Sequence, residues 1–269
     1  MEVIHGKKEA GKIGFPTANM RTTQENDTGI FFGLTNGLPS VIYTSTRDPF
    51  LIESHILNTT VELYGKCVTV DRLCKIRDDR DFDSMDDTLE QIRIDIQIAR
   101  ILSTMVDLPR RVALSFSGGK EACILYHCLQ MLEVRFDCFH YTSREGPIPE
   151  FVKQYNPVVF KGDMKTSVMF LDDTHDVSFL GVRRDDLKDR PEEYRSTWLT
   201  RCRLVCPLYH LDYHTIWRII DTLGVKVSHL YSEGYTSVGY GSRPNELLKR
   251  YSGGYNHART LKCVDFERK

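Results

Sequence analysis

VALSFSGGKE, residues 112–121, is the stretch that decides the fold of the second half of the chain. The apolar run 112–116 predicts a buried strand, and the residues after Lys120 predict a helix over 121–132. A strand that passes through a glycine-rich turn into a helix presents backbone amides and the helix N-terminus to an anion. The stretch therefore predicts a phosphate-binding loop. It is not a Walker A loop, because the first glycine of that motif would fall at Leu114.

Strands and helices alternate through the rest of this half. Apolar runs at 136–141, 158–160 and 177–182 predict further strands, and the segments between them have helical character. This alternation is typical of a parallel sheet with helices on both faces. We therefore expect an α/β fold after residues 108–111, where Leu-Pro-Arg-Arg reads as a linker.

The first hundred residues have a different pattern. Short strand-like runs, rich in β-branched and aromatic residues, are separated by Gly, Pro and Asn turns. The runs lie at 29–34, 40–43, 51–57 and 64–70. Antiparallel strands at this spacing predict a small β-barrel, closed or nearly closed. The chain thus has two predicted domains, residues 1–105 and 110–269.

A helix is predicted to end the first domain. Ser84 is a suitable N-cap residue, and Asp87 three residues later approximates a capping box. Leu89, Ile92 and Ile96 recur at helical spacing, so one face of this helix is apolar and can pack on the barrel.

The composition is typical of a globular protein. The 36 Lys and Arg nearly balance the 37 Asp and Glu, and the net charge of −1 does not favour a nucleic-acid partner. No apolar run is long enough to span a bilayer, and residues 1–5 do not resemble a signal peptide.

The eight cysteines include no C-x-x-C pair, which disfavours a zinc site at Cys202 and Cys206. We expect reduced cysteines, a cytoplasmic location and no membrane partner; the composition does not specify an oligomeric state.

The segment 5–19 has residue types that phosphoryl transfer to an alcohol requires. That reaction needs a cradle for the ATP phosphates, a metal, a base and the exclusion of water. Glycines at 6, 11 and 14 let the backbone approach phosphate, and lysines at 7, 8 and 12 add positive charge. Thr17 and Asn19 offer hard oxygen ligands for Mg²⁺ or phosphate. The glycines and lysines alone would indicate no more than a basic turn.

Three motifs in this half resemble those of riboflavin kinases. They are GFPTAN at 14–19, TGIFFG at 28–33 and ESHI at 53–56. The resemblance implies that Thr17 and Asn19 contact Mg²⁺ and the nucleotide, and that Glu53 is the catalytic base. A lone glutamate on a barrel strand is more often a solvated residue, so the role of Glu53 rests on the resemblance. The implied binding residues are Gly6, Lys12, Gly14, Thr17 and Asn19.

Three motifs in the second half resemble those of FAD synthases related to phosphoadenosine-phosphosulfate reductases. They are SFSGGKE at 115–121, GVRRDD at 181–186 and LYSEGYTSVG at 230–239. Adjacent arginines at a strand end can clamp phosphate oxygens, and the resemblance implies catalytic roles for Lys120, Arg183 and Arg184. The implied binding residues are Ser117, Gly118, Gly119, Glu121, Asp186 and Tyr235. Glu121 departs from the aspartate usual in that family.

Together the resemblances imply one polypeptide that phosphorylates riboflavin to FMN and adenylylates FMN to FAD. ATP would be the co-substrate of both steps, with Mg²⁺ as the metal and pyrophosphate as a product of the second step. Two alternatives remain open. In the first alternative, only one domain is active and the other is a flavin-nucleotide binding or regulatory module. In the second alternative, the second domain is a sulfonucleotide reductase or a related enzyme that cleaves ATP between its α- and β-phosphates. The Tyr-Thr-Ser sequence at 235–237 argues against a reductase.

Overall fold

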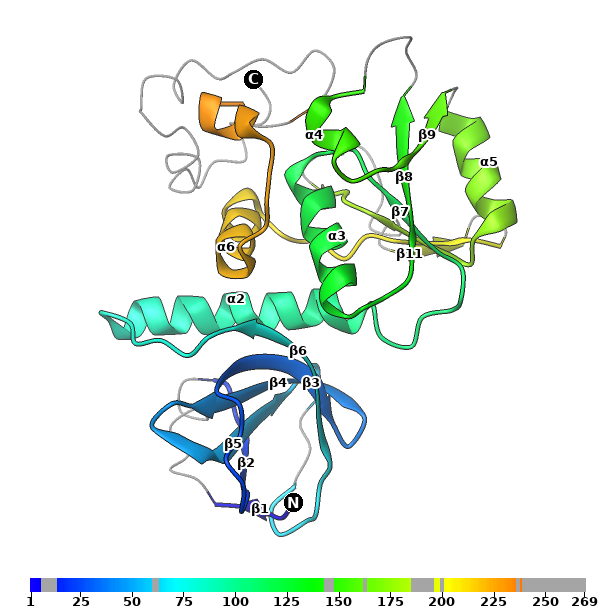
Figure 1. Ribbon diagram of the computed structural model, residues 1–269. Coiled ribbons are helices and arrows are strands. Elements are labelled where there is room, and N and C mark those ends of the chain that lie inside the picture. The colour runs from blue at the N-terminus through cyan, green and yellow to red at the C-terminus, as the bar shows by residue number, and fades with distance from the viewer. Residues whose placement is uncertain are drawn as a thin grey trace. The chain divides into compact units, whose positions relative to one another are not determined.

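The chain divides into two compact units, Met1–Thr104 and Met105–Lys269 (Figure 1). The structure is a computed structural model. It describes residues 1–5, 14–59, 63–142, 148–161, 164–184, 196–198, 201–235 and 238.

The first unit contains a six-stranded sheet in the order β1-β2-β5-β4-β3-β6, with every neighbouring pair antiparallel. The strands are β1 Val3–Ile4, β2 Ala18–Arg21, β3 Gly29–Thr35, β4 Leu38–Ser45, β5 Asp48–Ile56 and β6 Val70–Arg77. The sheet curves strongly (Figure 1). Its inner face buries an apolar core that includes Met20, Phe31, Ile42 and Ile52.

The two ends of this sheet are joined by backbone hydrogen bonds. Val3 N–H donates to Lys66 O at 3.0 Å, and Gly65 N–H donates to Val3 O at 3.0 Å. The first strand therefore bonds to the segment that leads into β6, and the predicted nearly closed barrel is confirmed.

The strand predicted at 64–70 is wrong in position. These residues form a turn, with a positive φ of 70° at Gly65 and an isolated bridge at Cys67, and the strand itself lies at 70–77. The reason is that Gly65 N–H and Lys66 O bond to Val3, and Val68 N–H bonds to Met1 O, so this segment pairs with the N-terminus and not with β3 as β6 does.

Helix α2, Met85–Ser103, begins at the predicted N-cap. Ser84 Oγ accepts from the Asp87 N–H at 3.1 Å, which is the N-cap bond of a capping box, and it donates to Asp87 Oδ2 at 2.6 Å instead of leaving that carboxylate to the Ser84 backbone N–H. The helix packs against β3 and β4 (Figure 1).

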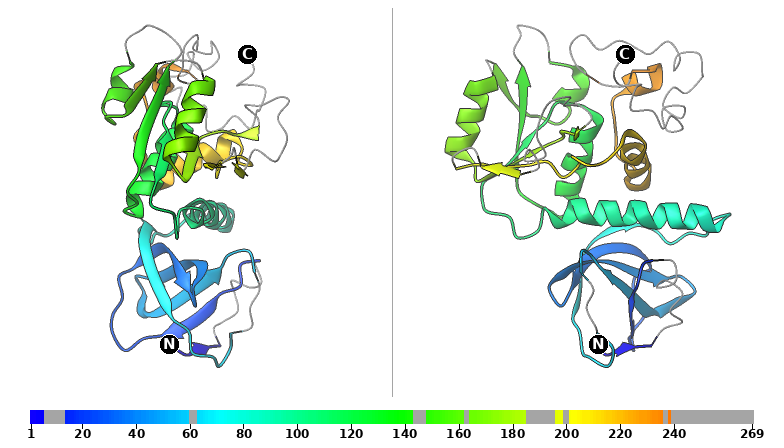
Figure 2. Two further views of the ribbon diagram at one scale, coloured as in Figure 1. Left: turned by 90° about the vertical axis from the view of Figure 1, so that its right-hand side faces the viewer. Right: turned by 180° about the vertical axis from the view of Figure 1, so that it is seen from behind.

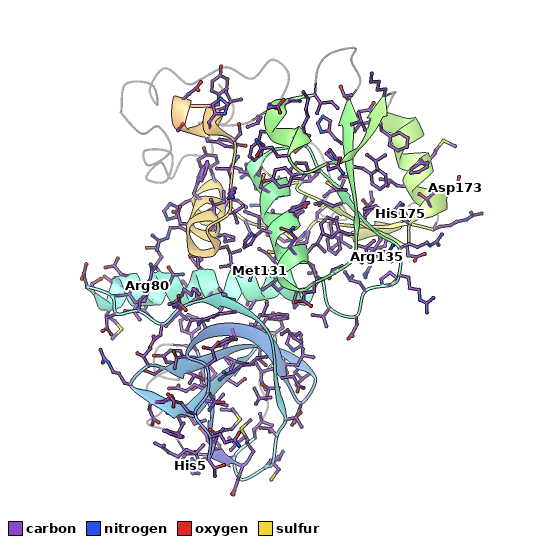
Figure 3. The ribbon with its side chains drawn as sticks, in the orientation of Figure 1. His5, Arg80, Met131, Arg135, Asp173 and His175 are labelled. Atoms are coloured by element: carbon purple, nitrogen blue, oxygen red, sulfur yellow. The ribbon has the colours of Figure 1, made fainter. Side chains whose placement is uncertain are left out.

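Polar side chains tie the end of β6 and the following segment to α2. Arg77 Nη2 lies 2.7 Å from Asp95 Oδ2, and Gln91 Nε2 donates to Asp95 Oδ1 at 2.9 Å. Arg80 donates to Gln91 Oε1 at 2.9 Å and lies beside the helix (Figure 3). These contacts hold the helix in place over the cavity described below.

The second unit contains a sheet in the order β11-β12-β10-β7-β8-β9. Its strands are β7 Val112–Ser115, β8 Asp137–Thr142, β9 Val158–Lys161, β10 Val177–Leu180, β11 Ser196–Trp198 and β12 Arg203–Val205. Five of these strands are parallel, and β11 runs antiparallel to β12. The helices are α3 Lys120–Met131, α4 Glu150–Lys153, α5 Met164–Thr174 and α6 Tyr213–Leu223, followed by the 3₁₀ helix η3 His229–Glu233.

Helices α3 and α5 flank this sheet (Figures 1 and 2). The chain moves outward from β7 through β8 to β9 and then returns to β10 on the other side of β7. Because crossovers between parallel strands are right-handed, this reversal places α3 and α5 on opposite faces, as the sequence predicts. Leu171 of α5 packs on Ala113 and Phe139. Among the residues that the structure describes, no helix is long and apolar enough to cross a membrane.

Candidate functional site

A cavity of about 700 Å³ opens beside β5 in the first unit. Its aliphatic lining includes Ile30 of β3, Val41 of β4 and Ile92 and Ile96 of α2. Its polar lining includes Thr17, Tyr43, Glu53, His55, Arg77 and Asp79. The cavity therefore has an aliphatic wall and a polar wall, which suits a flat apolar ring system that carries a polar chain.

The predicted residues Thr17 and Glu53 line the polar wall, and the predicted residue Asn19 is buried next to them. Strand pairing sets Asn19 opposite Glu53, because β2 and β5 are antiparallel neighbours. Thr17 Oγ1 donates to Glu53 Oε2 at 3.2 Å, and Asn19 Nδ2 donates to Thr17 O at 3.3 Å. Alternation along β5 buries Ile52 and Ser54 and turns Glu53 toward the cavity, as the sequence predicts.

The backbone conformation of Gly14 and the contacts of His55 hold the segment that carries Thr17. Gly14 has a φ of 90°, a conformation that residues with a Cβ rarely adopt. His55 Nδ1 lies 2.9 Å from Pro16 O, and its ring meets Phe15 edge-on. The histidine of the ESHI motif therefore links β5 to the GFPTAN segment. Gly6 and Lys12, also predicted to bind nucleotide, lie outside the described residues.

Asp79 is a functional candidate that sequence reasoning missed. Its carboxylate accepts from Tyr43 Oη at 3.2 Å and from Thr46 N–H at 2.9 Å, which ties the β4–β5 turn to the segment before α2. Burial raises the pKa of Tyr43. Burial also opposes ionisation of Asp79, but hydrogen bonds from Thr46, Tyr43 and Ser45 outweigh it and lower the pKa of this carboxyl. In the sequence Asp79 is one of several aspartates in an acidic segment, so nothing distinguished it.

The second site lies where strand order reverses. Strands β7 and β10 are adjacent and parallel, with Ser115 opposite Leu180. The phosphate-loop segment 116–120 follows β7, and the Gly-Val-Arg-Arg segment 181–184 follows β10. Ligands of open α/β sheets bind outside the carboxyl ends of strands at such a reversal. The fold therefore brings two of the predicted motifs to one place.

Glycines shape this loop for close packing. Gly118 has a φ of 83°, and a Cβ there would meet Val152 Cγ2 at 2.5 Å. Gly119 is the N-cap residue of α3, and its N–H donates to Ser117 Oγ at 3.2 Å. At Gly181 a Cβ would lie 2.9 Å from both Ala122 N and Glu121 Cβ. The end of β10 thus approaches the start of α3 too closely for any side chain.

Lys120, Glu121 and Arg183 form a buried cluster at the start of α3. Lys120 Nζ and Arg183 Nε each lie 3.0 Å from Glu121 Oε1. Burial alone would raise the pKa of Glu121, but the charges of Lys120 and Arg183 outweigh it and hold that pKa below its usual range. Arg184 is exposed, so the two adjacent arginines occupy different environments.

Two tyrosines that the sequence analysis did not predict as site residues lie next to Lys120. Tyr231 Oη accepts from the Lys120 backbone N–H at 3.0 Å, and the Lys120 ammonium lies 4.8 Å from the centre of the Tyr213 ring. Burial raises the pKa of Tyr231, which keeps its hydroxyl protonated. Tyr231 belongs to the LYSEGYTSVG motif, but nothing local indicated this long-range contact. Tyr235 is half-buried just after η3, and Asp186 lies outside the described residues.

Residues 1–103 match the riboflavin kinase family model, and residues 160–244 match that of the phosphoadenosine phosphosulfate reductase domain. A Caenorhabditis elegans protein named probable FAD synthase is 30% identical over 152 residues, which cover 48% of this chain and 29% of that protein. A bifunctional riboflavin kinase/FMN adenylyltransferase of Haemophilus influenzae is 32% identical over 110 residues, or 36% of each chain. A solved phosphoadenylyl-sulfate reductase from Candida auris aligns over 60% of this chain and 97% of its own, with 13% identity and a TM-score of 0.36. The chain spans about a third of the length of the curated relatives it matches.

Proposed function

We propose that this chain, which joins a riboflavin kinase domain to a phosphoadenosine phosphosulfate reductase-like domain, makes FAD from riboflavin in two steps. The first unit transfers the γ-phosphoryl group of ATP to riboflavin, and the second transfers the AMP moiety of another ATP to FMN. The observation that carries the proposal is the hydrogen-bonded pair of Thr17 and Glu53 at the polar wall of a cavity large enough for a flavin.

In the first unit Glu53 is the general base. The flavin ring would lie against the aliphatic wall, which directs the ribityl chain toward Glu53. The carboxylate would accept the proton of the terminal hydroxyl as its oxygen attacks the γ-phosphorus and the bond to ADP breaks. The hydrogen bond from Thr17 orients the carboxylate and fixes the position from which it acts.

The donor set fits Mg²⁺. Thr17 supplies a hydroxyl oxygen beside the Glu53 carboxylate, and Asn19, whose amide nitrogen lies 3.5 Å from Thr17 Oγ1, carries an amide oxygen. Mg²⁺ is usually held by one or two protein oxygens together with phosphates and water. Thr17 and Asn19 would hold the ion, which when bound neutralises charge on the ATP phosphates.

In the second unit the phosphate loop and its neighbours receive ATP. The N-terminus of α3 favours the negative charge of the phosphates, and Lys120 places a cation next to it. A phosphate oxygen of FMN would attack the α-phosphorus while the bond to the β-phosphate oxygen breaks, releasing pyrophosphate. The attacking group is already an anion at neutral pH, so this step requires charge stabilisation rather than a base.

The test is to incubate the purified chain with riboflavin, ATP and Mg²⁺ and to resolve the flavins by chromatography. Both FMN and FAD should form, and FAD should also form from supplied FMN. FMN without FAD would leave the second unit as a binding module. FAD from FMN, but no product from riboflavin, would leave the first unit in that role.

A further inference from the structure

Lys120 and Arg183 share a single acceptor atom, Glu121 Oε1, at 3.0 Å from each nitrogen. The side chains of Lys120, Glu121 and Arg183 are only 2%, 12% and 1% exposed. Charge-assisted hydrogen bonds in such surroundings are strong and directional. Each cation is therefore held in one direction by a carboxylate that the other cation also stabilises.

Lys120 is held at its backbone as well. The Tyr231 hydroxyl accepts its N–H, and its ammonium lies 4.8 Å from the Tyr213 ring centre and 5.6 Å from that of Tyr231. These rings come from α6 and η3, whereas Glu121 lies on α3 and Arg183 follows β10. Helix α6 and η3 thus contact Lys120 directly, and the segment after β10 acts on it through Glu121.

The two adjacent arginines differ in what they can reach. Arg183 is enclosed, with its guanidinium on Glu121. Arg184 is exposed, and its backbone N–H donates to Tyr209 O at 2.8 Å, which fixes the direction in which its side chain leaves the chain. An arginine buried against a carboxylate keeps that carboxylate in place, whereas an exposed one at a strand end can meet an incoming phosphate.

We propose that Glu121 and Arg183 are positioning residues for FMN adenylylation. Arg183 holds Glu121, Glu121 directs the ammonium of Lys120, and Arg184 is the arginine that contacts the substrate phosphates. The proposal rests on the function proposed for the second unit and refines it, because it separates the roles of two arginines that the sequence pairs.

The experiment is a double-mutant cycle in the full chain with Glu121→Gln, Arg183→Met and the combined variant. FMN adenylylation is measured as kcat, KM for ATP and the Mg²⁺ concentration at half-maximal rate. Each single variant should lower kcat by at least about tenfold, because Lys120 loses its orientation. The combined variant should lose little more than either single variant, because residues that act through one contact are not additive.

Other outcomes would overturn the proposal. Multiplied losses in kcat would mean that Glu121 and Arg183 act independently. A higher Mg²⁺ requirement in Glu121→Gln would make Glu121 a metal ligand. Arg184→Met should mainly raise the KM for ATP, and in a variant that combines it with Glu121→Gln the two losses of activity should multiply. An unchanged KM for ATP would mean that Arg184 does not contact the substrate. Asp176→Asn, which breaks an exposed ion pair with Arg111 in the same unit, is the matched control and should keep kcat.

Tyr231→Phe covers the case in which a charge variant does not fold. It removes only the hydroxyl that accepts the Lys120 N–H, and kcat should fall several-fold with KM for FMN unchanged. A wild-type kcat in this variant would overturn the positioning of Lys120.

Failure of the proposed function can be told apart from failure of this proposal. If the wild-type chain forms no FAD from FMN, the proposed function fails, and the same cycle is read in the Kd for ATP by titration calorimetry. Non-additive weakening would still support the positioning roles, whereas additive weakening, or no ATP binding by the wild-type chain, would overturn them.

Discussion

Arg77 and Asp95 form a buried ion pair that joins strand β6 to helix α2, with 2.7 Å between Arg77 Nη2 and Asp95 Oδ2. Their side chains are 11% and 3% exposed. Removing one partner of such a pair leaves the other charge buried without compensation, which costs far more than the loss of an exposed pair. The pair is therefore a specific point at which the first unit can be weakened.

Asp95→Asn should destabilise the first unit by about 3–5 kcal/mol. Urea unfolding of residues 1–105, followed by circular dichroism, measures this change in the free energy of unfolding. Asp81→Asn is the control, because the Arg47–Asp81 pair is exposed and its loss should change stability little. Equal effects of the two substitutions would contradict the importance assigned to the buried pair.

Each unit should fold without the other. The chain divides after Thr104 into two units, each with most of its contacts internal, and each unit has its own sheet and its own core. Fragments 1–105 and 108–269 should each be soluble and show one cooperative transition in urea. A fragment that stays unfolded until the other is added would show that the boundary is misplaced or that the units depend on each other.

Glu53→Gln should separate the two activities. Glutamine keeps the size of the side chain but removes its ability to accept a proton, and a general base contributes about 10²–10⁴ in rate. Riboflavin phosphorylation should fall by that order, while FAD formation from supplied FMN stays near the wild-type rate. Glu25→Gln, in an exposed loop of the same unit, should change neither rate. Normal phosphorylation by Glu53→Gln would end the assignment of Glu53 as the base.

Lys120→Ala should produce the reverse separation. The ammonium lies at the start of α3, where negative charge would develop, and removing one such group costs about 10²–10³ in rate. FMN should therefore accumulate from riboflavin without conversion to FAD. Lys226→Ala, at an exposed lysine of the same unit, serves as the control. Undiminished FAD formation in Lys120→Ala would place the second site elsewhere.

The lowered pKa of Glu121 predicts how the second unit responds to acid. In the unfolded chain this carboxyl titrates near its ordinary value of about 4.3. The folded state binds the proton less readily, so the stabilisation is complete above that pH and is lost as pH falls through the lower folded pKa. The stability difference between wild type and Glu121→Gln should therefore stay constant from pH 7 down to about pH 5 and shrink as the pH falls further.

Tryptophan fluorescence in urea can follow this difference in the full chain. Both tryptophans, Trp198 and Trp217, belong to the second unit, so the first unit does not contribute to the signal. A difference that stays constant across the pH range would mean that Glu121 does not titrate differently in the folded state.

Much of the fold follows from local patterns. Apolar alternation and turn residues predict β3, β4 and β5, and the strand–helix alternation predicts the parallel sheet. The strand predicted at 64–70 is wrong because hydrogen bonds to Val3, more than sixty residues earlier, decide the conformation of that segment. Local propensity carries no information about such a partner.

The candidate site is also predictable only where local sequence motifs determine it. The motifs placed Thr17, Asn19 and Glu53 together, and the structure brings them together. The contact between Lys120 and Glu121 was not predictable, because adjacent residues on a helix usually point in different directions. It depends on Arg183, which folding brings to the same carboxylate from 62 residues away.

Gly181 sets the distance between the two segments that meet at Glu121. An added Cβ would lie 2.9 Å from Glu121 Cβ and from the backbone of the next residue, which belongs to a helix and cannot yield as a flexible side chain can. Even one methyl group would therefore push the strand end outward and carry Arg183 with it. The lack of a Cβ at position 181 therefore sets the spacing of the charged cluster. A mutational scan of position 181 should find alanine nearly as damaging to FAD formation as any larger residue.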